Sequence, residues 1–159
     1  MPPARPRSAA PRPPSAAFLR RFFRRDRFAA AAGVKIVEAG PGRAVCRMKV
    51  TPRHLNGVDV VQGGAVFTLA DTAFAVACNT AGPVALAIDV TVSFLAATTA
   101  GTLTATAVEV SRSSRLSRVE VEVRDQAGAR VALFHGTAYV TRDTLAAVAS
   151  RARQGARRG

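Results

Sequence analysis

Alternating apolar and polar residues fill most of the chain after residue 83. Between residues 116 and 124, Val119, Val121 and Val123 alternate with charged side chains, and this period of two is typical of antiparallel strands with one solvated face. Similar β-rich runs predict four strands, at residues 84–96, 101–112, 114–125 and 129–142. Because the segments between them are short and turn-like, we expect these strands to follow one another as a meander.

The first third of the chain changes from a helical to an alternating pattern. Residues 17–32 place apolar side chains such as Phe18 and Phe22 on one face and arginines on the other, which predicts a helix that ends at Gly33. The next two segments, VKIVEAG and RAVCRMKV, alternate around Pro41–Gly42. This arrangement predicts a hairpin.

A long apolar run, GGAVFTLADTAFAVACN at residues 63–79, has the length of a buried helix but carries Asp71 near its middle. No other residue between Asp59 and Asp89 bears a formal charge. The residues expected to share the helical face of this aspartate are Phe67, Phe74, Ala75 and Cys78. A carboxylate in such surroundings is costly unless it is paired or hydrogen-bonded. It is therefore a candidate functional group, although a structural bond to a Ser/Thr hydroxyl or to an arginine across an interface stays open.

The order of elements points to one fold class. A nearly all-apolar helix must bury most of its circumference, and a strongly curved antiparallel sheet can wrap around it. We therefore expect an α+β hotdog fold over residues 17–143, flanked by a disordered Pro/Ala/Arg-rich tail at 1–16 and a basic tail at 144–159. A single sheet layer leaves part of the helix and a sheet edge uncovered, so at least a dimer is expected.

The formal net charge of +13 lies mostly outside the predicted domain. Residues 1–27 hold eight arginines and one aspartate, and residues 150–159 hold four arginines. We interpret these segments as solvated appendages and expect no specific nucleic-acid partner. The two cysteines show no metal-binding spacing, and no apolar run is long enough for a bilayer. We expect no metal, no membrane partner and a cytoplasmic location.

Gly63 and Gly64 stand at the predicted helix start. The N-terminus of a helix offers unpaired N–H groups that suit an oxyanion or a polarised carbonyl. Asp71 lies about 11 Å farther along the helix axis at ~1.5 Å rise per residue, so it does not reach a carbonyl held at its own helix start. Two antiparallel helices from two subunits can bring these groups together, which predicts a composite site at a dimer interface.

The stretch HLNGVDVVQGGAVFTLADTAFAVACN, followed by IDVTVSFL and VALFHGTAYV, resembles the phenylacetic-acid-degradation (PaaI-type) thioesterases of the hotdog superfamily. The resemblance covers roughly residues 25–141. It implies an acyl-CoA thioesterase that favours phenylacetyl-CoA and its ring-hydroxylated relatives, and that works without a metal or a bound cofactor. It also implies a homotetramer built as a dimer of dimers.

The resemblance assigns roles by position. Asp71 matches the catalytic aspartate, which acts as general base or as nucleophile, and Gly63 matches the glycine whose N–H polarises the thioester carbonyl from the facing subunit. Asn56 matches the asparagine that orients the attacking water or the carbonyl. The residues expected to contact substrate are Gln62, Gly64 and Phe67. Gln62 stands where many members have histidine, so a positioning role fits it and an acid role does not.

Other readings stay open at the level of the sequence. A hotdog hydratase or dehydratase would use a histidine with an acidic residue, and His54 is near the motif. A nucleophilic Cys78 and a non-enzymatic acyl-CoA-binding module are further alternatives. Some related enzymes carry a Ser or Thr on the strand after the helix, a role that Thr91 or Ser93 could take here.

Overall fold

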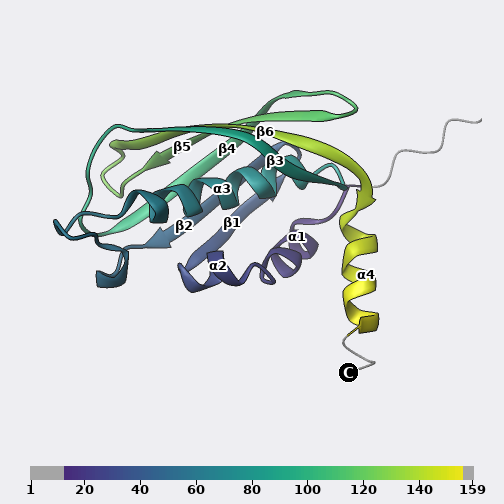
Figure 1. The fold of residues 1–159 in the computed structure, drawn as a ribbon, viewed down its shortest axis with the longest axis horizontal. Helices are drawn as coiled ribbons and strands as arrows, with labels where there is room; N and C mark the ends of the chain where they lie inside the picture. Colours follow the sequence, from purple (N-terminus) through teal and green to yellow (C-terminus); the bar gives the residue numbers. More distant parts are fainter. Residues whose placement is uncertain (1–12, 156–159) are drawn as a thin grey trace, which may run out of the picture.

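A curved antiparallel sheet wraps around one long helix (Figure 1). The computed structural model describes residues 13–155 of the chain. Its elements in chain order are α1 (Ala16–Phe23), α2 (Arg27–Ala31), β1 (Val34–Gly40), β2 (Arg43–Lys49), a 3₁₀ turn (Pro52–His54), α3 (Gly63–Asn79), β3 (Pro83–Phe94), β4 (Thr102–Arg112), β5 (Leu116–Arg124), β6 (Arg130–Thr144) and α4 (Leu145–Gly155). The expected hairpin, central helix and four later strands are all confirmed.

The first helical segment is two helices instead of the single helix that was predicted. The chain leaves helical geometry after Arg24 and starts again at Asp26, whose Oδ1 accepts a hydrogen bond from the Ala29 N–H at 2.9 Å. Aspartate is a favoured N-cap because its side chain satisfies an N–H that the first helical turn leaves free. The break therefore follows from a second cap inside one amphipathic pattern.

The strands form a sheet in the order β1-β2-β4-β5-β6-β3. Strands β4, β5 and β6 make the expected meander, but β3 was wrongly placed in it: it pairs with β6 at the far edge. The remaining edge of β4 is already taken by β2, with Met48 opposite Leu103. The chain crosses back from β3 through residues 95–101, where the Thr98 carbonyl accepts the Val61 N–H at 2.8 Å.

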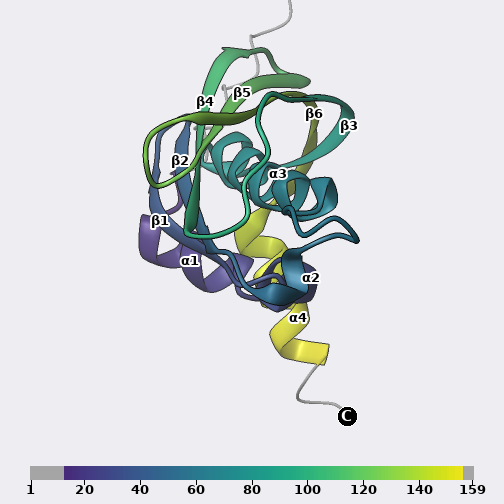
Figure 2. The same cartoon turned by 90° about the vertical axis from the view of Figure 1, so that its left-hand side faces the viewer.

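The core lies between α3 and the concave face of the sheet. Figure 2 shows α3 inside the curve of the sheet, with α1 and α2 on the side that the sheet leaves open. Phe74 and Phe134 are fully buried with ring centroids 5.6 Å apart. A Cβ at Gly136 would lie 2.5 Å from the Phe74 ring, so a glycine is needed for α3 to approach β6 this closely. Residues on the sheet-facing side of α3 are thereby held in fixed positions.

Part of the predicted C-terminal tail is helical. Residues 145–155, predicted as part of a basic tail, form α4, which leaves the sheet at the end of β6 (Figure 1). Residues 1–12, which were predicted to be disordered, and residues 156–159 lie outside the part of the chain that the structure describes. Between residues 13 and 155, no helix is long and apolar enough to cross a membrane.

Candidate active site

Asp71 lies on the side of α3 that faces away from the sheet. Its carboxyl-bearing face is half-buried, whereas Phe74 and Cys78, which were expected to share that face, are fully buried against the sheet. Phe67 and Ala75, the other two residues expected on that face, are partly uncovered like Asp71. The positions of the helix that are not buried are Gly63, Gly64, Ala65, Phe67, Thr68, Asp71 and Ala75. The aspartate thus points toward a surface that one protomer leaves open.

Within residues 13–155 the Asp71 carboxylate has no partner. No hydrogen-bond donor and no cation contributes to its surroundings, and its pKa is raised by burial and, to a smaller extent, by the negative charge of Asp26. The neighbouring hydroxyls are used elsewhere: Thr68 donates to the Gly64 carbonyl at 2.8 Å and Thr72 to the Thr68 carbonyl at 2.7 Å. A structural bond from these threonines is therefore excluded.

The start of α3 is capped by Gln62. Its Oε1 accepts hydrogen bonds from the Gly64 N–H and from the Ala65 N–H, the latter at 3.2 Å. The Gly64 N–H is consequently not free for a substrate. The Gly63 N–H, in contrast, finds no acceptor in the described part of the chain. One backbone donor at this helix start stays available.

An apolar cavity of about 340 Å³ adjoins this donor. Gly63 lines it together with residues of the segment before α3, of α3 itself, of β6, and of the end of β3 with the loop after it: Val60, Val61, Val66, Val131 and the run Phe94–Thr98. A Cβ at Gly63 would lie 3.0 Å from Cζ of Phe94. The Phe94 ring therefore stands directly against the backbone of the helix start.

Asn56 builds the turn that leads into the helix. Its Oδ1 accepts hydrogen bonds from the Val58 N–H at 3.0 Å and the Val60 N–H at 3.3 Å, a common side-chain mimic of a backbone turn. Its backbone N–H donates to the Val60 carbonyl at 2.8 Å. Only the side-chain amide nitrogen is left for a substrate or a water molecule.

The structure separates the predicted site residues within one protomer. Gly63 and Asp71 are eight residues apart on α3, or about 12 Å along the axis at ~1.5 Å per residue. Phe67 is half-buried and contacts the core, with its ring centroid 5.5 Å from that of Phe134. Asp71 and the group around Gly63 and Gln62 thus form two half-sites.

The histidines and cysteines have structural or peripheral positions. The buried His54 accepts the Thr51 N–H at Nδ1, at 3.0 Å, which places its proton on Nε2 facing the Ala32 carbonyl at 3.1 Å. Both ring nitrogens are therefore occupied. Burial raises the pKa of the Cys78 thiol to about 12, so it is not a thiolate nucleophile near neutral pH. No cluster suited to a metal ion occurs in residues 13–155.

The hydroxyl groups on β3 do not face α3. Thr91 pairs with His135, which is exposed between the buried Phe134 and Gly136, and Ser93 lies on the same side two residues later. Paired residues in an antiparallel sheet point to the same face. Thr91 and Ser93 are therefore on the outer face of the sheet, away from Asp71.

Comparison with known proteins matches this geometry to one family. A sequence profile of the thioesterase superfamily matches residues 59–132. The acyl-coenzyme A thioesterase PaaI of Escherichia coli K12 is 40% identical over 119 residues, which cover 74% of this chain and 85% of the relative. The chain belongs to the thioesterase superfamily. The hotdog fold predicted from the sequence is confirmed, and the protein is a thioester hydrolase.

Solved structures agree with this thioesterase over most of its length. The E. coli PaaI protein from the phenylacetic acid degradation operon has a TM-score of 0.76 at 39% identity, covering 78% of this chain and 91% of that one. A mutant form of the phenylacetic acid degradation protein PaaI from Thermus thermophilus has a TM-score of 0.69 at 39% identity, with 72% and 98% covered. The predicted PaaI-type resemblance is confirmed.

Two residues near the site of this thioesterase were not singled out by the sequence. Asp26 is 45 positions from Asp71 in the chain, and its effect on the Asp71 carboxyl arises only when α2 folds against α3. Phe94, the last residue of β3, contacts Gly63 only in the folded chain, 31 positions away in the sequence. No local pattern marks either contact. The capping role of Gln62 did have a signal, a polar residue directly before an apolar helical run.

Proposed function

We propose that this thioesterase hydrolyses acyl-CoA thioesters, with Asp71 as the catalytic carboxylate. The observation that carries the proposal is the half-buried Asp71 carboxylate, which has no donor and no cation around it in the described protomer. A protein gains no stability from such a group, because burial disfavours its charged form. A raised pKa makes a carboxylate a stronger base toward a water molecule.

The proposed reaction uses one base and one backbone donor. Asp71 accepts a proton from a water molecule as the water oxygen attacks the thioester carbonyl carbon, and the resulting oxyanion is held by the Gly63 N–H. The tetrahedral intermediate collapses, the carbon–sulfur bond breaks, and coenzyme A leaves as a thiolate that takes up the proton. Direct attack by the Asp71 carboxylate, followed by hydrolysis of the anhydride, is the second route that this geometry allows.

We propose that the two half-sites meet across a dimer. Strand β3 is an open sheet edge that carries exposed apolar side chains, with Leu86 60% and Ile88 61% exposed. An exposed edge of this kind pairs readily with another strand. Pairing of β3 with β3 of a second copy supports antiparallel placement of the two α3 helices, with each Asp71 facing the other helix start. Association of two such dimers into a tetramer remains part of the proposal.

The proposed substrates are phenylacetyl-CoA and related aryl-acetyl thioesters. The apolar cavity beside Gly63, about 340 Å³ in volume, is at the small end of ligand pockets and suits a compact acyl group. The names of one relative, E. coli PaaI, as an acyl-coenzyme A thioesterase and as a protein of the phenylacetic acid degradation operon, support the same class. Two free, buried cysteines, Cys46 and Cys78, support a reducing, cytoplasmic location.

The alternatives receive less support. A hydratase would need a titrating histidine, and His54 has both ring nitrogens engaged by the backbone. A binding module without activity would not need an unpartnered carboxylate at the site. Neither alternative is favoured by an observation of its own.

The test is release of free coenzyme A from a panel of thioesters by the wild type and by Asp71→Asn. The panel runs from phenylacetyl and hydroxyphenylacetyl to short and medium aliphatic acyl groups. We expect aryl-acetyl members to be hydrolysed fastest and Asp71→Asn to lower turnover by orders of magnitude while remaining folded. Absence of turnover by folded wild type on every member would refute the proposal.

A further inference from the structure

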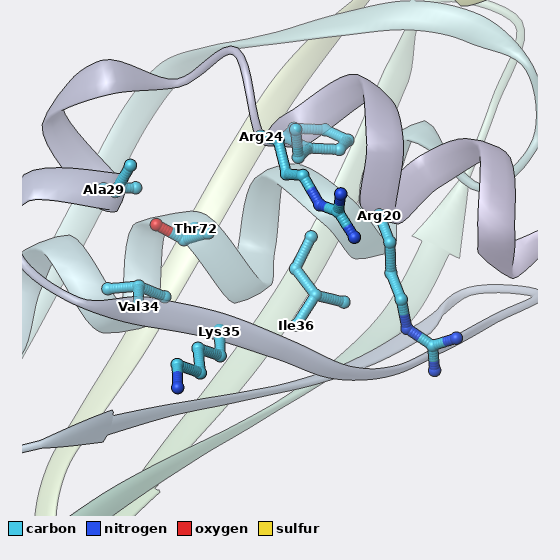
Figure 3. Close-up of a pocket in the computed structure, with 9 residues that line it drawn as sticks. Arg20, Arg24, Ala29, Val34, Lys35, Ile36 and Thr72 are labelled. Atoms are coloured by element: carbon cyan, nitrogen blue, oxygen red, sulfur yellow. The ribbon is translucent and has the colours of Figure 1, made fainter.

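A second cleft lies on the opposite side of α3 from the β3 edge. It opens between the α1–α2 segment and β1, has a volume of about 380 Å³, and includes Thr72 of α3 in its lining. Figure 3 shows Arg24 extending across this cleft beside Ile36, and Thr72 pointing toward Ala29 of α2. None of the half-sites described above contributes a residue to it.

The cleft combines an apolar floor with a cationic rim. The apolar lining residues are Phe23, Ala29, Ala30, Val34 and Ile36. The rim carries Arg20, Arg24 and Lys35, and no carboxylate lines the cleft. Within residues 13–155, none of these three cations forms a salt bridge. Within the described residues, the positive charge at the rim of this apolar cleft is therefore not neutralised by a carboxylate.

Both arginines of the rim keep guanidinium N–H groups that no described residue accepts. One terminal nitrogen of Arg20 donates to the Val37 carbonyl at 2.6 Å, which fixes its guanidinium at the rim and leaves its other N–H groups free. The guanidinium of Arg24 has no hydrogen bond to another described residue, and the residue is exposed. A guanidinium matches a carboxylate in shape and binds it with two parallel hydrogen bonds.

We propose that this cleft binds a small amphiphilic carboxylate, with the anionic head at Arg24 and Arg20 and the apolar body on Ile36 and Val34. The positive rim excludes a metal cation, and the small apolar volume does not suit a whole coenzyme A. The acid released by thioester hydrolysis has this chemistry, and naming it as the ligand rests on the proposed function. The cleft would then hold product beside the helix that carries Asp71.

The test is a titration of the isotopically labelled protein with phenylacetate, followed by amide chemical shifts, with the neutral isostere phenylacetamide in parallel. Phenylacetate is expected to shift the signals of Val34, Lys35 and Ile36, and phenylacetamide is not. Arg24→Gln should weaken this binding about tenfold, the loss of roughly one charge-assisted pair. The control is Arg25→Gln, a neighbouring arginine outside the cleft whose guanidinium sits over the Phe22 ring at 5.5 Å.

Three results would overturn the proposal: shifts confined to Gly63 and Gly64, equal shifts with phenylacetamide, or equal weakening by Arg24→Gln and Arg25→Gln. Equal weakening would mean that only the general positive charge matters. The measurement requires no turnover, so its outcome is independent of the thioesterase assay. A protein that binds phenylacetate in the cleft but cleaves no thioester would refute the proposed function and the naming of the ligand as product, while the site itself would stand.

Discussion

Replacing Gly63 by proline removes its N–H group without breaking a hydrogen bond within the protein. Gly63 is the first residue of α3, and Gln62 before it has φ −63° and ψ 134°, the extended conformation that a residue preceding proline prefers. Proline is well tolerated at the first helical position because its missing N–H has no partner within the helix. Here the Gly63 N–H has no acceptor in residues 13–155, so no protein hydrogen bond is lost.

Gly63→Ala is the matched control, because it adds a Cβ but keeps the N–H. That Cβ would lie 3.0 Å from Cζ of Phe94, the far end of a half-exposed ring that can move outward. We therefore expect a change of a few-fold in kcat for alanine. If the N–H stabilises the oxyanion, proline should lower kcat by roughly 10²–10³ relative to alanine, the usual effect of losing one such donor.

The assay is steady-state coenzyme A release, with thermal unfolding of both variants to verify that they fold. The comparison that matters is proline against alanine, since both add bulk next to Phe94. A proline variant that turns over within a few-fold of the alanine variant would show that the Gly63 N–H takes no part in catalysis.

Further substitutions at Asp71, Gln62 and Phe94 test the roles proposed for these residues. Asp71→Asn should lower kcat by roughly 10²–10⁴ yet raise the free energy of unfolding at neutral pH. Because folding raises the carboxyl pKa from its ordinary 3.8, the wild type loses stability as pH rises through the folded pKa, so the gain should vanish below pH 3.8 in denaturant titrations across pH. An equal gain at every pH, or a loss, would contradict this. Gln62→Ala should lower the free energy of unfolding by about 1 kcal/mol through loss of the cap, and Gln62→Asp should recover most of it; equal stability of all three proteins in urea would exclude capping. Phe94→Ala should shift kcat/KM toward longer acyl chains by enlarging the cavity beside Gly63. Val110→Ala, an exposed position on β4 outside that cavity, should not. An unchanged chain-length profile for Phe94→Ala would show that Phe94 does not line the acyl pocket.

The sequence predicted the elements better than their arrangement. The hairpin around Pro41–Gly42 and the helix from Gly63 follow from local periodicity and turn residues, which neighbouring positions encode. The pairing of β3 with β6 was missed because a strand's partner depends on which edges other strands have already filled. The break at Asp26 depended on the competition between one long amphipathic pattern and an internal cap.

The candidate site, too, could be predicted from the sequence only in part. Asp71 could be found because one charge in a long apolar run is visible without a fold. Its lack of partners, the use of the Gly64 N–H by Gln62 and the contact of Phe94 with Gly63 all required coordinates. The cleft below α1 could not be predicted from the sequence, because it forms between residues 20–36 and Thr72, which lies 36 positions after Ile36.

The central claim is that Asp71 of one subunit works with Gly63 of another, and mixing two inactive variants tests it directly. Asp71→Asn and Gly63→Pro are each expected to be nearly inactive alone. In a mixed dimer, one of the two sites combines an intact Asp71 with an intact Gly63.

After unfolding and refolding of the two variants together in equal amounts, half of the dimers should be mixed and each should hold one intact site. Coenzyme A release should therefore return to about a quarter of the wild-type rate, by random pairing in a two-fold dimer. Recovery to this level would support the composite site. A mixture no more active than the mean of the two parents, with mixed dimers verified by mass, would contradict it.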